Sequence, residues 1–261
     1  MGEGMLKEIF FVPVGPKDTK RVRWTVGSIR KFETDYKVYL LLDGVNPDQL
    51  ADGVLGSDTV VILNPAPTGG HLGLIWSMQM AGMVQALHRA EMDPECIFVK
   101  IDCDAVLMRP GFGRRARDLF RTRPHAGLIG NCFTNIVGGR LSNRGWEDHF
   151  RRSCELRGLI YFLRSRTGIG ASIRDSIGAW WSWRSLIRDA RQNGYTFGEF
   201  PLGGCYALRP TVIGNLEKNG TITKLPARFI PKIAEDVLMG PLVYVAGFSE
   251  MDDTCDDGLF S

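Results

Sequence analysis

The chain has 261 residues, of which 44% are hydrophobic, so it is long enough to bury one substantial core. Its formal net charge is +3, from 32 basic and 29 acidic residues, which excludes the strongly basic field typical of nucleic-acid binding. No apolar run reaches the roughly 20 residues of a membrane span, and the start of the chain, Met1–Met5, lacks the apolar region of a signal peptide. These features predict one domain without a transmembrane segment, resident in the cytoplasm.

Short apolar runs alternate with stretches of helical periodicity through the first hundred residues. The predicted strands are 7–14, 38–42, 60–63 and 96–101, and the predicted helices are 19–33 and 72–90. This alternation predicts a parallel sheet with helices on its faces, in which ligands bind beyond the carboxyl ends of the strands. Pro13, Asp43 and Asp102 all fall at such ends.

The strand at 96–101 runs directly into Asp102-Cys103-Asp104. Because side chains alternate along a strand, Lys100, Asp102 and Asp104 are expected to project from the same side. Magnesium and manganese ions prefer oxygen ligands, and such an ion would relieve the repulsion between the two carboxylates while binding a phosphate. We therefore predict Asp102 and Asp104 as metal ligands, with a turn or helix-cap role as the alternative.

Two later segments are candidates for chemistry. Glu235 and Asp236 open an apolar, helical turn, and one of them could remove a proton from a hydroxyl group. The alternative is structural, because acidic residues are favoured in the first turn of any helix. Gly203 and Gly204 precede a strand-like run at 205–208, where glycine suits either a loop against a ligand or an ordinary turn.

Three segments resemble, in the same order, the KxDxD, GGxYxL and EDVxxG blocks of β-1,3-glycosyltransferases: Lys100–Asp104, Gly203–Leu208 and Glu235–Gly240. Val12-Pro13-Val14 and Leu42-Asp43-Gly44 are similar to the nucleotide-binding start of bacterial family-two glycosyltransferases. The chain thus resembles the inverting glycosyltransferases of the GT-A fold, in short islands over most of its length. The resemblance implies an α/β fold with a Rossmann-like, mixed and mainly parallel sheet flanked by helices.

The resemblance also implies a reaction. A hexose would move from a nucleotide-diphosphate donor, with a UDP-sugar favoured, to a hydroxyl-bearing acceptor such as a glycan, a lipid or a small molecule. The transfer would proceed with inversion and would need Mn²⁺ or Mg²⁺. A single GT-A domain over 1–261 would divide into a nucleotide-sugar-binding half, 1–110, and an acceptor-binding and catalytic half, 111–261.

The roles that the resemblance implies fall on a small set of residues. Asp236 would be the catalytic base, and Asp104 the chief metal ligand, with Asp102 near the metal or the ribose. The expected donor-binding residues are Pro13, Val14, Asp43, Lys100 and Asp102. The expected acceptor or donor-sugar residues from the resembling segments are Gly203, Gly204 and Glu235. Residues 140–200 have no counterpart in the resemblance, and we expect them to bind the acceptor, with Trp181, or else Trp180 or Trp183, stacking on a sugar ring, although core packing is the commoner fate of tryptophan.

The chain departs from the family in one respect. Such enzymes often use a histidine near the C-terminus as a metal ligand, and no histidine follows His149 here. The acidic run Asp252–Asp257 could supply an oxygen ligand instead, but a solvated, disordered tail is the favoured interpretation. Inversion depends on Asp236 acting as a base, so a retaining mechanism stays open.

Two other functions fit parts of the pattern. A sugar-phosphate nucleotidyltransferase would share the sheet, the nucleotide and the metal, but its phosphate loop has only Gly15-Pro16-Lys17 as a weak counterpart. A noncatalytic nucleotide-sugar-binding protein would keep the fold without turnover. The six cysteines form no CxxC pair and no zinc spacing, so free thiols are expected. The run Arg114-Arg115-Ala116-Arg117 is expected to be a solvated helix face.

Overall fold

The computed structural model describes residues 5–64, 72–132, 151–155, 173–197, 199–201, 204–224 and 235–253, together with residues 148 and 158. The strands in this part of the chain are β1 (Leu6–Val14), β2 (Tyr36–Asp43), β3 (Thr59–Asn64), β4 (Met92–Ile101), β5 (Ala126–Gly130), β6 (Cys205–Leu208) and β7 (Ser249–Asp252). The helices are α1 (Val22–Phe32), the 3-10 helix η1 (Pro47–Gln49), α2 (Leu72–Arg89), α3 (Phe112–Thr122), α6 (Ile173–Gln192), α7 (Pro210–Lys218), α8 (Thr221–Lys224) and α9 (Glu235–Val245). None of the described helices is both long and apolar enough to cross a membrane.

The strands form one sheet in the order β3-β2-β1-β4-β6-β5-β7. Strands β1 to β4 are mutually parallel, β5 and β7 are parallel to each other, and β6 runs antiparallel to both of its neighbours, β4 and β5. The carboxyl ends of all the strands except β6 therefore meet at one edge of the sheet. This arrangement confirms the predicted α/β class with a mixed, mainly parallel sheet flanked by helices.

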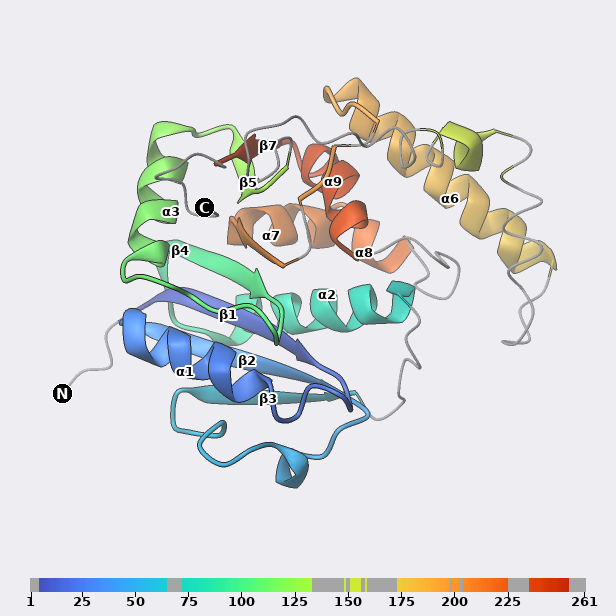
Figure 1. Ribbon diagram of the computed structural model, residues 1–261. Coiled ribbons are helices and arrows are strands. Elements are labelled where there is room, and N and C mark those ends of the chain that lie inside the picture. Colours follow the sequence, from blue (N-terminus) through green and yellow to red (C-terminus); the bar gives the residue numbers. More distant parts are fainter. Residues whose placement is uncertain are drawn as a thin grey trace.

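Helices cover both faces of the sheet (Figure 1). Because neighbouring residues of a strand point to opposite faces, Phe10 belongs to one hydrophobic core and Phe11 to the other. The core around Phe10 is completed by α1 and α3, and the core around Phe11 by α2, α6, α7 and α9. Burial on both faces explains why β1, β2 and β4 read as continuous apolar runs in the sequence.

Helix α1 shows how the sequence fixes these layers. Its buried residues Val22, Val26 and Ile29 recur at the spacing of one helical face. Each contributes about 1.5–3 kcal/mol when fully removed from water. The elements predicted in the first hundred residues are all present, as are the strand at 205–208 and the helix that begins at Glu235.

The expectation of a solvated arginine face on α3 is wrong for Arg117. Its guanidinium forms an ion pair with Glu8, whose side chain is only 3% exposed. Arg114 is exposed, as expected. The thiols of Cys96, Cys103, Cys132, Cys154 and Cys205 are free, as predicted, and Cys255 lies outside the described residues.

Glu33 is a second buried glutamate, beside Glu8, at the amino edge of the sheet. It follows α1, and its Oε1 accepts a hydrogen bond of 2.9 Å from the backbone N–H of Phe112 at the start of α3. Burial, followed by the neighbouring charge of Glu8, raises the pKa of Glu33 to about 7. Two carboxyl groups thus share a buried position beside the first turn of a helix.

Candidate functional site

The carboxyl ends of β1, β2 and β4 lie next to one another, and the residues that follow them form the candidate site. In the register of the sheet, Val14 lies beside Leu42 and Phe11 lies beside Lys100. Ligands of open α/β sheets bind at this kind of edge. The sequence-predicted residues that the register brings to it are Pro13, Val14, Asp43 and Asp102.

Asp43 is held in place by a residue that the sequence analysis did not select. Its Oδ1 accepts a hydrogen bond of 2.9 Å from Nδ2 of Asn64, which lies beside it as the last residue of β3. The bond fixes a partly exposed carboxylate at the edge of the sheet, where it can accept hydrogen bonds from N–H or O–H groups. A polar residue closes both apolar runs, so the signal that selected Asp43 also existed for Asn64.

Lys100 and Asp102 form an ion pair at the end of β4. Nζ of Lys100 lies 2.7 Å from Oδ1 of Asp102, and the two side chains are 0% and 34% exposed. Burying an ammonium group is expensive unless an opposite charge compensates it, so Asp102 stabilises Lys100 in the core. The same contact orients the Asp102 carboxylate, and it agrees with the predicted alternation of side chains along the strand.

Asp104 lies in a turn and not in the strand. β4 ends at Ile101, and the backbone N–H of Ala105 donates a hydrogen bond of 3.0 Å to the carbonyl of Asp102. The strand alternation therefore ends before Asp104, whose place is set by this turn. Its side chain is exposed, so the turn presents a solvated carboxylate two residues beyond Asp102.

Helix α1 anchors this turn. The buried hydroxyl of Thr25 donates a hydrogen bond of 2.7 Å to the carbonyl of Ala105, and the carbonyl of Asp102 lies 3.4 Å away. Cys103 belongs to the same turn. Its burial, followed by the neighbouring charge of Asp18, raises the pKa of its thiol to about 12. Cys103 is therefore protonated at neutral pH and is unsuited to act as a nucleophile.

Gly204 contacts the same turn through its backbone. Its carbonyl accepts a hydrogen bond of 2.9 Å from the N–H of Asp102, just before β6 pairs with β4. A Cβ atom added at Gly204 would meet nothing within 4 Å, so packing does not require glycine there. The open space leaves room for a ligand against this backbone. Gly203 lies outside the described residues.

Asp236 lies in the first turn of α9, and its Oδ1 accepts a hydrogen bond of 2.8 Å from the N–H of Val237. After α9 the chain turns at Gly247, where φ is +87°, and enters β7. This reversal makes α9 run opposite to β7, so the first turn of α9 lies on the side of the carboxyl edge of the sheet. The helix has 11 residues, each of which adds about 1.5 Å to its length. Glu235 begins the helix, and its side chain lies outside the described part of the chain.

Gly240 of the same segment has a packing role. A Cβ atom there would lie 2.2 Å from the backbone carbonyl oxygen of Glu199. Glu199 and Phe200 lead toward Gly204, so the close approach at Gly240 ties α9 to the segment that reaches the turn after β4. The glycine that resembles part of an EDVxxG block is thus explained by backbone contact.

The two acidic residues after β4 have the chemistry of a ligand pair for a hard cation. In the described residues, no group of three or more histidine, cysteine, aspartate or glutamate side chains is arranged to hold a metal ion. Asp102 and Asp104 offer carboxylate oxygens, and both are at least partly exposed. Magnesium-type ions take one or two carboxylates and complete their coordination with phosphate and water. The donor set therefore fits a cation that binds together with a diphosphate.

The expectation of a disordered acidic tail is wrong for its first two residues. Asp252 closes β7, and its Oδ1 accepts a hydrogen bond of 3.1 Å from the N–H of Cys132. Asp253 is 9% exposed, and its N–H donates a hydrogen bond of 3.2 Å to the carbonyl of Gly130. These carboxylates therefore belong to the edge of β5 and β7, and the rest of the tail, 254–261, lies outside the described residues.

Of the three tryptophans considered for sugar stacking, only Trp181 presents its ring to solvent. Trp181 is 57% exposed, whereas Trp180 and Trp183 are buried. The indole N–H groups of Trp180 and Trp183 donate hydrogen bonds of 3.0 and 2.8 Å to the carbonyl and the hydroxyl of Ser153. The guanidinium of Arg184 lies 5.2 Å from the Trp181 ring centroid, a cation–π distance.

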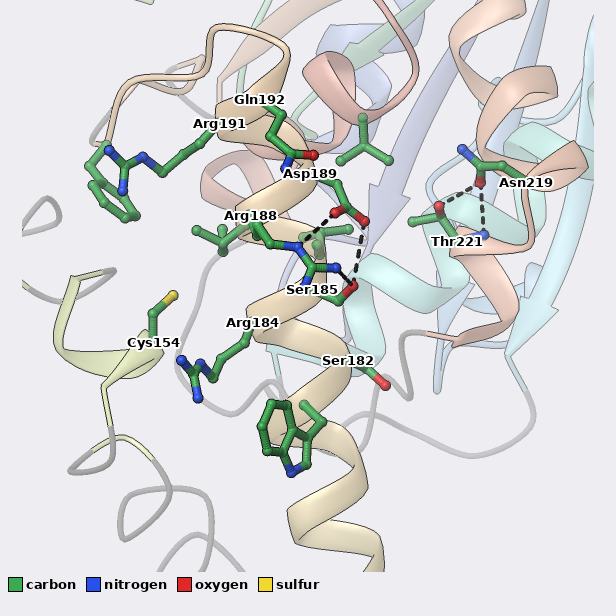
Figure 2. A pocket seen from close by; sticks show the side chains of 15 residues that line it. Cys154, Ser182, Arg184, Ser185, Arg188, Asp189, Arg191, Gln192, Asn219 and Thr221 are labelled. Atoms are coloured by element: carbon green, nitrogen blue, oxygen red, sulfur yellow. Dashed lines mark hydrogen bonds and ion pairs between the residues drawn. The ribbon is translucent and has the colours of Figure 1, made fainter.

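Trp181 lines a groove of about 1010 Å³ beside α6. In Figure 2, Arg184 and Arg191 extend from α6 toward the side on which Cys154 lies, while Asn219 and Thr221 lie across from the helix on the other side. Arg184 makes cation–π contacts with the rings of Trp180 and Trp181. Arg188 donates hydrogen bonds to the side chains of Asp189 and Ser185 in its own helix. The groove thus combines an exposed aromatic face with cationic side chains.

No protein-family model and no curated protein matches this sequence. Among solved structures, the chain is similar to the mannosyltransferase PcManGT from Pyrobaculum calidifontis in complex with GDP-Man and Mn²⁺, with 12% identity and a TM-score of 0.47 over 95% of this chain and 55% of that one. It is also similar to the galactosyltransferase LgtC in complex with donor and acceptor sugar analogues, with 11% identity and a TM-score of 0.43 over 93% and 72% of the two chains.

A third similar structure is a CMP:2-keto-3-deoxy-manno-octonic acid synthetase complexed with CTP, with 14% identity and a TM-score of 0.45 over 94% of this chain and 89% of that one. The chain spans about half the length of the mannosyltransferase.

Proposed function

We propose that this chain is a glycosyltransferase that moves a sugar from a nucleotide-diphosphate donor to an acceptor hydroxyl. The observation that carries the proposal is the acidic turn after β4, where Asp102 is anchored by buried Lys100 and Asp104 is exposed. This turn lies at the sheet edge to which β1 and β2 also bring their carboxyl ends. Residues 1–110 would bind the donor, and residues 111–261 would bind the acceptor.

In the donor half, Asp43 would accept hydrogen bonds from the nucleoside, beside the backbone of Pro13 and Val14. Its bond to Asn64 fixes the carboxylate before a ligand arrives, which lowers the entropic cost of binding. Lys100 keeps a positive charge next to Asp102, where it would help to balance the charge of a diphosphate. A UDP-sugar is the favoured donor.

Asp104, with Asp102, would hold Mn²⁺ or Mg²⁺ against the donor. Such a cation would supply Lewis-acid stabilisation of the negative charge on the departing diphosphate. The exposed carboxylate of Asp104 would bind it directly, while Lys100 restrains the orientation of Asp102.

In the acceptor half, Asp236 would act as the base. The acceptor oxygen forms a bond to the anomeric carbon, the bond from that carbon to the diphosphate oxygen breaks, and the hydroxyl proton passes to the carboxylate of Asp236. Attack opposite to the departing diphosphate gives inversion. Glu235, the Gly203-Gly204 backbone and Trp181 would position the two sugars.

The test separates donor binding from transfer. Asp104→Ala should abolish metal-dependent donor binding in calorimetry, whereas Asp236→Asn should keep donor binding and lose donor hydrolysis and transfer. Asp48→Ala, an exposed aspartate of η1, is the matched control and should behave like the wild type. Thermal melts identify a folding defect, and equal destabilisation by both site variants would defeat this division of roles.

The products distinguish the other two functions. A nucleotidyltransferase would release pyrophosphate from a nucleoside triphosphate, and a binding protein would retain the donor unchanged. Either result in mass spectrometry would replace the proposed transfer with that activity.

A further inference from the structure

One exposed face carries both apolar and basic side chains. It adjoins the acidic turn, in which the carboxylate of Asp104 is exposed. It is formed by α1, by the segment that precedes α1, and by the loop at 105–109. We call it the α1 face and define it by its exposed side chains. They are Lys17, Lys20, Arg21, Trp24, Val106 and Met108.

The loop at 105–109 is fixed along the side of α1. The hydroxyl of Thr25 donates a hydrogen bond of 2.7 Å to the carbonyl of Ala105, and the backbone N–H of Leu107 donates one of 3.0 Å to Oγ of Ser28. Figure 1 shows the segment between β4 and α3 passing alongside α1. Helix and loop therefore present one continuous surface.

The apolar side chains of this surface point outward. Leu107 is 7% exposed and belongs to the core under α1, whereas its neighbours Val106 and Met108 are 44% and 79% exposed. Trp24 is 64% exposed and lies one helical turn before Ser28, on the flank of α1 that touches the loop. A tryptophan on α1 and a valine and a methionine on the adjoining loop are thus exposed on the surface that helix and loop form together.

Basic residues precede and adjoin Trp24 at the start of α1. Residues 17–23 contain four basic side chains and one acidic side chain, while the whole chain has a net charge of only +3. Lys17, Lys20 and Arg21 are exposed, and the guanidinium of Arg23 lies 4.7 Å over the ring of Trp24. Tryptophan flanked by lysine and arginine is suited to the boundary between lipid headgroups and acyl chains.

We propose that the α1 face docks on an anionic phospholipid bilayer, with Trp24 and Met108 inserted and the basic residues on the headgroups. Charge complementarity favours this occupant, because anionic headgroups can bind Lys17, Lys20 and Arg21, whereas an uncharged apolar partner offers them no opposite charge and a nucleic acid would gain little from the protruding Met108. Asp104 precedes Val106 by two residues, so docking brings the acidic turn close to the lipid surface. The binding itself does not depend on sugar transfer.

Vesicle flotation tests the docking, with phosphatidylcholine vesicles that contain or lack phosphatidylserine. The wild type should float only with the anionic vesicles and should dissociate as salt rises. Lys20→Glu with Arg21→Glu should weaken binding by at least roughly 25-fold, since each lost basic residue near the surface costs about fivefold. Trp24→Ala should weaken it by about tenfold or more, from the lost burial of the ring.

Trp181→Ala is the matched control, because Trp181 is similarly exposed and is also flanked by an arginine. It should float like the wild type, and fluorescence quenching by brominated lipid should be lost in Trp24→Phe but not in Trp181→Phe. Loss of flotation in Trp181→Ala but not in Trp24→Ala would assign docking to α6 and overturn the proposal. The proposal is also overturned if the wild type does not float with anionic vesicles, or if it binds single-stranded RNA and not vesicles. Thermal melts show whether each variant is folded.

Discussion

The ion pair between Lys100 and Asp102 is the most direct structural support of the candidate site, and replacing Lys100 with methionine tests it. Methionine keeps the length and the apolar contacts of the stem but removes the ammonium group, which is completely buried and 2.7 Å from the carboxylate. Breaking a fully buried pair costs about 3–5 kcal/mol, and an exposed pair is worth about 0–1 kcal/mol. Asp102 is 34% exposed and can regain water, so we expect a loss of about 2–3 kcal/mol in the free energy of unfolding.

Urea unfolding of the wild type and four variants measures this effect. Lys7→Met is the matched control, since Lys7 pairs with Asp35 at 3.2 Å with both side chains nearly half exposed, and it should cost less than about 1 kcal/mol. Lys100→Met combined with Asp102→Asn should cost less than the sum of the two single changes, because no charge is left without its partner. If Lys100→Met costs no more than Lys7→Met, or the double cycle shows no coupling, the pair does not anchor the turn.

Two further predictions concern stability away from the ion pair. The pKa of Glu33, about 7, exceeds the ordinary 4.5, so the folded protein binds more protons than the unfolded chain between these values. Its stabilising contribution is complete below about pH 4.5 and is lost as pH rises to about 7. In denaturant titrations, Glu33→Gln should reduce the fall in the free energy of unfolding with pH over this range by up to about 1.4 kcal/mol per pH unit. An unchanged slope would contradict this. Gly240→Ala should destabilise by about 1–3 kcal/mol, because its Cβ meets the Glu199 carbonyl at 2.2 Å. Gly178→Ala, a helical glycine whose Cβ would meet nothing within 4 Å, should instead stabilise by about 0.5–1 kcal/mol, and similar melting shifts in the two variants would refute the packing role.

The first half of the fold was predictable because each element carries a strong local signal. Strands β1, β2 and β4 are buried on both faces over most of their length, and α1 repeats Val22, Val26 and Ile29 at helical spacing, so the sequence alone indicates strand and helix. Helix α6 was missed even though Trp180, Trp183 and Ile187 recur on its buried face. Its other tryptophan and its arginines obscure this face, and they are accommodated by the groove and by cation–π contacts.

The candidate site was predictable only in its local parts. Strand alternation predicts that Lys100 and Asp102 share a side, since the two residues belong to one continuous strand end. The bond from Asn64 to Asp43 joins residues 21 positions apart, and the contact of Thr25 with Asp102 joins residues 77 positions apart. Such contacts depend on strand order and helix placement, which residue patterns do not specify. The reversed direction of β6, a strand of four residues, has the same origin.

The most direct test of the proposed function is calorimetry of UDP-, GDP-, CMP- and dTDP-linked sugars with and without Mn²⁺, using the wild type and Asp104→Ala. The account predicts that one nucleotide-diphosphate sugar binds to the wild type only when Mn²⁺ is present, and that Asp104→Ala, folded as judged by its melting curve, does not bind it. Absence of binding across the panel, or donor binding that persists without metal and in Asp104→Ala, would contradict the claim that the acidic turn after β4 is a metal-dependent donor site.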